Sequence, residues 1–142
     1  MAEGIFLDLL ETEGLSHAVE VDSAGTASYH IGELPDHRMR DTARKNGIEL
    51  VRRARQFVAE DFHEFDHILA MDSSNYRDIM YLKPQGDTRA KVHLMREFDQ
   101  MDKGGSVPDP YYGGQGGFDE VFDILMRSNS EFLRMLRNET KL

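Results

Sequence analysis

The sequence contains no cysteine among its 142 residues. This absence excludes disulfide bonds, thiolate metal sites and cysteine nucleophiles from these residues. Long hydrophobic runs are absent as well, because no apolar stretch approaches the ~18 residues that a membrane-spanning helix needs. The chain also shows no internal repeat and no low-complexity tract. We therefore expect a single domain, residues 1–142, with enough length to bury one core.

Positive charge is scarce. The formal net charge of −9 argues against binding to nucleic acid or to an anionic membrane. The first residues lack the basic region of a secretory signal, so we expect a cytoplasmic protein. One local exception is the basic run Arg52-Arg53-Ala54-Arg55. It can be read as a solvated face or as a region that attracts an anionic substrate.

Apolar periodicity and turn residues divide the chain into alternating helices and strands. In chain order we expect a helix over 2–10, a strand over 18–23, a helix between Pro35 and Gly47, a helical turn over 60–65, a strand over 66–71, a helix over 73–82, a strand over 91–95 and a helix over 118–136. Such alternation predicts an α/β fold with a parallel sheet.

The most informative segment is Val107-Pro108-Asp109-Pro110-Tyr111-Tyr112-Gly113-Gly114. Two prolines restrict the backbone around Asp109, so its carboxylate is held in place as a general acid requires. The simpler reading is a rigid turn with a solvated carboxylate. Active sites of parallel sheets lie beyond the carboxyl ends of the strands. Ser23, Asp72 and the segment containing Asp109 all follow predicted strands, which favours a functional Asp109.

Three other patterns are weaker. His63 and His67 have helical i, i+4 spacing, but they span a predicted helix-to-strand junction, so we expect no metal site there. The glycine-rich run 113–117 does not match a dinucleotide-binding motif and is read as a flexible loop. Ser23 and Thr26 have hydroxyl groups, but the sequence places no histidine to activate them. We expect Ser23 to be a hydrogen-bonding residue at a strand end.

Six segments, in order, resemble the low-molecular-weight protein-tyrosine phosphatases. They are Met1-Ala2-Glu3-Gly4-Ile5-Phe6, Val21-Asp22-Ser23-Ala24-Gly25-Thr26, Gly32-Glu33-Leu34-Pro35-Asp36, Arg53-Ala54-Arg55-Gln56, Phe65-Asp66-His67-Ile68-Leu69-Ala70-Met71-Asp72 and Asp109-Pro110-Tyr111-Tyr112-Gly113. The resemblance spans essentially all of the chain. It implies a three-layer fold with a small parallel sheet flanked by helices.

The resemblance also implies a chemistry. Members of this family hydrolyse phosphate monoesters through a phosphocysteine intermediate, without a cofactor or metal. The cysteine lies in a Cys-x5-Arg loop whose backbone amides bind the phosphate. By this resemblance, Asp109 protonates the leaving phenol and then activates water. Tyr29, Tyr111 and Tyr112 would flank the aryl group of a phosphotyrosine protein or a small aryl phosphate, and Ser23 would support the phosphate loop.

The chain departs from the family at its start. The first strand and the Cys-x5-Arg loop, ~15 residues, are not in this sequence. We therefore expect an N-terminally truncated domain that lacks the nucleophile and is catalytically inactive. In the family the strand lies inside the sheet, between residues 19–23 and 68–71. Its loss would expose strand edges, which a homodimer or a strand swap could cover.

Three alternative functions follow from the same resemblance. A non-catalytic interaction protein could use the same scaffold without a nucleophile. A protein-arginine phosphatase is also open, since that preference depends partly on residues inside the loop that the sequence does not contain. Arsenate reduction is the weakest alternative, because it needs further cysteines downstream and this chain has none.

Overall fold

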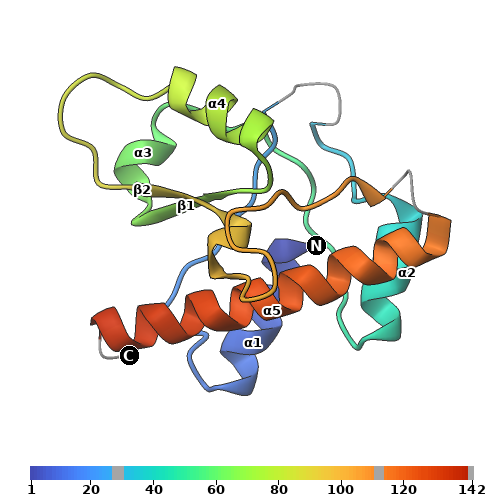
Figure 1. Ribbon diagram of the computed structural model, residues 1–142. Coiled ribbons are helices and arrows are strands. Elements are labelled where there is room, and N and C mark those ends of the chain that lie inside the picture. Colours follow the sequence, from blue (N-terminus) through green and yellow to red (C-terminus); the bar gives the residue numbers. More distant parts are fainter. Residues whose placement is uncertain (27–30, 111–113, 141–142) are drawn as a thin grey trace.

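A computed structural model describes residues 1–26, 31–110 and 114–140. A small parallel sheet lies between two layers of helices (Figure 1), with α3 and α4 on one side and α5 and α1 on the other. The elements are α1 (Ala2–Thr12), α2 (His37–Lys45), α3 (Asp61–Glu64), β1 (His67–Ala70), α4 (Ser73–Tyr81), β2 (Lys91–Leu94), the 3₁₀ helix η1 (Met95–Phe98) and α5 (Gly114–Thr140). The predicted α/β class and layering are confirmed.

Local signals in the sequence set several helix ends. The Asp36 side chain accepts a hydrogen bond from the Arg38 backbone N–H at 2.9 Å and so caps α2. Asp72 caps α4 in the same way, through the backbone N–H of Asn75 at 2.7 Å. After α1 the chain turns at Gly14, whose φ of 72° favours glycine. These capping groups explain why the helix positions could be predicted.

The longest helix begins earlier than its apolar pattern indicates. Gly114, Gly116 and Gly117 lie in α5, so reading this glycine run as a loop was wrong for residues 114–117. A Cβ atom at Gly117 would lie 2.7 Å from the carbonyl oxygen of Pro110, so close approach of two backbone segments requires glycine there. Among the described residues, no helix is both long and apolar enough to cross a membrane.

The sheet is smaller than predicted. Strands β1 and β2 pair in parallel, with His67 opposite Lys91 and Ala70 opposite Leu94. The strand expected over 18–23 was wrong, because in the described chain this segment belongs to no ladder. Only an isolated bridge between Gly25 and Gln56 follows it. A strand is defined by its hydrogen-bonded neighbour, and this segment has none beside it.

The core consists of three apolar clusters, one at each end of α5 and one between the sheet and α3 and α4. Their buried members are Ile5, Ala43, Ile48, Leu50, Met95, Val121, Phe122 and Leu125 in the first, Phe6, Leu10, Leu15, Phe132, Leu133 and Leu136 in the second, and Phe57, Phe62, Ile68, Ala70 and Ile79 in the third. The half-buried Leu69 of β1 packs against the first two clusters. His93 of β2 packs against Phe132, and Lys91 of β2 pairs with Glu139 at 3.3 Å, so side chains of both strands join the sheet to α5.

One fully buried carboxylate ties α5 to the segment after η1. Asp99 accepts hydrogen bonds from Arg127 Nε and Nη2, both at 3.0 Å, and from Arg96 Nε at 2.9 Å. It also accepts the backbone N–H of Met101 at 3.0 Å. The Arg127 guanidinium, with these other donors, lowers the pKa of Asp99 to about 2.

We expect Asp99→Asn to lower the free energy of unfolding by about 3–5 kcal/mol, because it removes the buried charge that two arginines face. Asp66→Asn is the matched control, since its ion pair with Arg89 is exposed and is worth less than ~1 kcal/mol. The pKa of Asp99 is depressed in the folded state, so its contribution is present above pH 3.8 and is lost as the pH falls toward 2. Urea unfolding between pH 2 and 7 measures both effects, and equal losses for the two variants would contradict this assignment.

Two histidines stack across the sheet. His67 Nδ1 lies 3.1 Å from His93 Nε2, and their ring centroids are 5.3 Å apart. Phe132 and Phe98 pack edge-on against this pair. Burial lowers the pKa of His67, and the neighbouring His93 lowers it further. The folded state therefore favours the neutral form of His67.

Acid is expected to weaken the fold through this pair. Because the pKa of His67 is lower when folded, its contribution is complete above pH 6.5 and decreases as the pH falls below 6.5. Glu139 and Asp66 oppose this shift, and Lys91 reinforces it. His67→Gln should flatten the pH dependence of the urea midpoint between pH 7.5 and 5. His63→Gln, at an exposed position, is the control. If the urea midpoint of the unsubstituted protein and of both variants changed equally with pH, His67 would not cause the acid sensitivity.

Candidate active site

The segment that contains Asp109 crosses the carboxyl end of β1. The backbone N–H of Val107 donates to the carbonyl oxygen of Met71 at 2.8 Å, directly beyond the strand. Pro110 is buried, whereas Asp109 is exposed. The structure thus brings Asp109 to the sheet edge where the sequence placed it, with its side chain on the surface. Asp72, predicted at the same edge, is used as the cap of α4.

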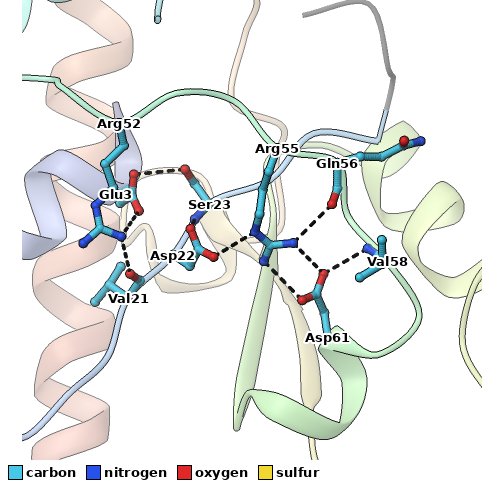
Figure 2. A network of polar contacts seen from close by, with 9 residues as sticks. All are labelled: Glu3, Val21, Asp22, Ser23, Arg52, Arg55, Gln56, Val58 and Asp61. Carbon is cyan, nitrogen blue, oxygen red and sulfur yellow. Dashed lines mark hydrogen bonds and ion pairs between the residues drawn. The ribbon is translucent and has the colours of Figure 1, made fainter. Parts of the chain in front are cut away.

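Ser23 lies at the same side of the molecule and contacts the first turn of α1. Its hydroxyl donates to Glu3 Oε1 at 3.0 Å, and Arg52 Nη1 donates to Glu3 Oε2 at 3.1 Å (Figure 2). Arg52 Nη1 also reaches the carbonyl oxygen of Val21 at 3.1 Å. Glu3 therefore links α1 to the extended segment 18–23. The sequence anticipated a hydrogen-bonding Ser23, but not this partner.

Arg55 forms the second half of the network. Its Nε donates to Asp22 Oδ2 at 2.8 Å, and its Nη1 and Nη2 donate to the two oxygens of Asp61 at 3.0 and 3.1 Å (Figure 2). Asp61 also accepts the backbone N–H of Val58 at 2.9 Å. The hydrogen bonds to Asp61, and then those to Asp22, raise the pKa of Arg55 above its ordinary value. This guanidinium is a fixed structural cation.

In the basic run Arg52-Arg53-Ala54-Arg55, the three arginine side chains bind groups of the protein itself. Arg52 and Arg55 pair with carboxylates, and Arg53 Nη1 donates to the carbonyl oxygen of Gly32 at 2.9 Å. The run is therefore neither a purely solvated face nor a set of arginines held ready for an anion. Sequence reasoning missed Glu3 and Asp61 as partners. Arg52 and Glu3 are 49 residues apart, so no local pattern indicates their pairing.

A cavity of about 1100 Å³ lies between the network and the sheet. Residues 18–26 form one wall and residues 64–71 another, and Met1, Pro108 and Pro110 lie at its border. Protein interiors are normally close-packed, so an opening of this size beside a strand is unusual. It lies where the family resemblance implies an interior strand.

The remaining predicted site residues are not brought together here. Tyr29, Tyr111 and Tyr112 lie outside the described residues. His63 and His67 are on different elements, and His67 contacts His93 instead. Among residues 1–26, 31–110 and 114–140, no three metal-ligand side chains form a group that could hold an ion. Around the cavity, Glu3, Asp22 and Asp61 pair with arginines. Asp109 lies at the supported sheet edge, between Pro108 and Pro110, which line the cavity.

Comparison with known proteins identifies similar sequences and structures. Residues 1–142 match the model of a protein family described as "Low molecular weight phosphotyrosine protein phosphatase". A putative low molecular weight protein-tyrosine-phosphatase from Synechocystis is 44% identical over 138 residues, covering 97% of this chain and 88% of the relative.

Solved structures agree with this similarity. A protein tyrosine phosphatase from Entamoeba histolytica, with Hepes in the active site, superposes with a TM-score of 0.90 at 37% identity. The match covers 99% of this chain and 89% of that one. The drosophila arginine phosphatase has a TM-score of 0.87 at 28% identity, covering 96% and 88%.

The network should hold segment 18–23 in place. We expect Arg55→Met to lower the free energy of unfolding by about 3 kcal/mol, because Asp61 is buried and would lose its cationic partner. It should also speed amide hydrogen exchange at Gly25. Arg53→Met is the control, since its contact to Gly32 is exposed, and it should cost less than ~1 kcal/mol. Unchanged exchange at Gly25 in Arg55→Met would show that the network does not anchor this segment.

Proposed function

Because this chain belongs to the low molecular weight phosphotyrosine protein phosphatase family, we propose that it is the acid-base half of a phosphotyrosine phosphatase site. In this proposal Asp109 protonates the leaving phenolate and later takes a proton from the attacking water. The observation that carries it is the bond from Val107 to Met71, which ties the Asp109 segment to the carboxyl end of β1. Active sites of parallel sheets occur at that edge.

The substrate class follows from the aromatic residues beside Asp109 in the sequence. We propose that Tyr29, Tyr111 and Tyr112 flank the phenyl ring of a phosphotyrosine side chain or a small aryl phosphate. Ser23 would support the phosphate-binding loop, and its bond to Glu3 supports that role by fixing the strand-end segment. A phosphotyrosine protein in the cytoplasm is the proposed physiological partner.

These 142 residues do not supply the nucleophile. The family mechanism needs a cysteine thiolate, and the sequence has no cysteine. We therefore propose that the chain alone does not hydrolyse phosphomonoesters. Loss of a nucleophile typically removes several orders of magnitude of rate, and Asp109 cannot replace a covalent intermediate.

Phosphoarginine hydrolysis is a second candidate function. The likeness to the drosophila arginine phosphatase keeps phosphoarginine as an alternative substrate class for the complete site. A non-catalytic interaction protein is the alternative for the chain alone, supported by the missing thiol. Arsenate reduction has the least support, because it requires additional cysteines.

To test this proposal, we would extend the chain before Met1 with a segment from a family member that contains one strand followed by a Cys-x5-Arg loop. Phosphatase activity is then compared between the 142-residue chain and the extended protein. The chain alone should show no turnover of p-nitrophenyl phosphate, and the extended protein should show cysteine-dependent turnover. Asp109→Asn in the extended protein should lower kcat by about 10²–10⁴-fold, the usual contribution of a general acid. Asp87→Asn, on an exposed loop, is the matched control.

Two results would overturn the proposal. Turnover by the unextended chain would mean that another group acts as nucleophile. Full activity of Asp109→Asn in the extended protein would remove Asp109 from the acid-base role. Comparing phosphotyrosine with phosphoarginine peptides on the extended protein separates the two substrate classes.

A further inference from the structure

The two stacked histidines of the sheet have the geometry of a metal-binding pair. We propose that His67 and His93 together bind one divalent transition-metal ion, copper(II) most tightly, and so link β1 to β2. The site is separate from Asp109 and involves no turnover, so it is independent of the function proposed above. Three features of the structure support it: the spacing of two ring nitrogens, a carboxylate behind one ring, and the packing that holds both rings.

The two ring nitrogens that face each other have the spacing of two ligands of one ion. His67 Nδ1 and His93 Nε2 are 3.1 Å apart. Imidazole nitrogens bound to one ion at ~2.0–2.1 Å, at angles between square-planar and tetrahedral, lie about 2.9–3.4 Å from each other. Histidine χ2 is a soft torsion, so rotation of each ring can turn both nitrogens toward a common point. The backbone therefore needs no large movement to form the site.

A carboxylate lies on the far side of the His93 ring. Its second nitrogen, Nδ1, is 3.5 Å from Glu97 Oε2, and Glu97 Oε1 accepts the backbone N–H of Leu94 at 3.0 Å. Metal-binding histidines commonly direct their second ring N–H to a carboxylate, which orients the ring and raises the basicity of the other nitrogen. Glu97 thus favours the tautomer of His93 whose Nε2 is free to bind. The hydrogen between the rings then belongs to His67, and it moves through water to His67 Nε2 when the ion binds.

Neighbouring elements hold both rings in place. His67 lies on β1 and His93 on β2, and these two strands pair with each other in parallel. Phe132 of α5 packs edge-on against both rings, with centroids 5.5 and 6.4 Å away, and Phe98 packs against His93. A pair positioned in this way loses little conformational freedom when it binds an ion. Both side chains are half-buried, so an ion with its water ligands can reach them.

The ligand type and the local charge determine the class of ion. Imidazole nitrogens suit copper, nickel and zinc, whereas magnesium and calcium prefer oxygen ligands. Near the pair, Lys91 is neutralised by Glu139 and Asp66 by Arg89, while Glu97 has no lysine or arginine partner within the described ranges. Glu97 therefore adds a negative charge that favours a cation. Water completes the coordination of the two-histidine site, so binding is weaker than at a structural zinc site with four protein ligands.

The test is a calorimetric titration of the complete 142-residue chain with nickel(II) chloride, repeated with copper(II) and magnesium(II). Copper should bind more tightly than nickel, and magnesium should not bind measurably. His93→Gln should weaken nickel binding about 100-fold because it removes a ligand, and Glu97→Gln about tenfold because it removes only the supporting carboxylate. His63→Gln, at an exposed position outside the pair, is the matched control and should leave the nickel affinity unchanged.

NMR spectroscopy shows where the ion binds, because paramagnetic nickel(II) should broaden the ring signals of His67 and His93 first. Circular dichroism checks that the variants fold, and Glu97→Gln, which keeps both rings, tests the site even if His93→Gln does not fold. Unchanged nickel affinity in either folded variant would overturn the proposal. It would also fail if broadening began at His17, His37 or His63, or if neither copper nor nickel bound saturably.

Discussion

Burial of one face of α5 is the constraint on which the other elements depend. The helix supplies Val121, Phe122 and Leu125 to one core cluster and Phe132 and Leu133 to the next, so two clusters share a single rigid axis. Helices α1 and α2 and the 3₁₀ helix η1 pack against it (Figure 1). An amphipathic helix must bury its apolar stripe to be stable in water. The sheet can therefore keep its position although it consists of two short strands.

Local structure could be predicted from the sequence, because its causes are local. The caps at Asp36 and Asp72 and the turn glycine at Gly14 act within a few residues. Strands β1 and β2 were found for the same reason, since their apolar runs are short and bounded by turn signals. The position of Asp109 beyond the strand ends followed from the topology of parallel sheets.

The rest depends on residues far apart in the chain. Segment 18–23 has a strand pattern, but strand formation needs a neighbour that the described residues do not provide. Gly117 was read as part of a loop, although in α5 it allows the carbonyl oxygen of Pro110 to approach, a contact that no apolar periodicity indicates. His67 and His93 are 26 residues apart, and Arg55 and Asp22 are 33 residues apart. No single-sequence pattern specifies such pairs, so the network could not be predicted.

The recessed edge of β1 also has a consequence for solubility. Open strand edges are the sites where folded proteins join into fibres, because one sheet can extend another without limit. Here the edge lies inside a groove with walls at residues 18–26 and 64–71. These walls set the edge back from the molecular surface, where two folded copies would have to meet for their sheets to pair.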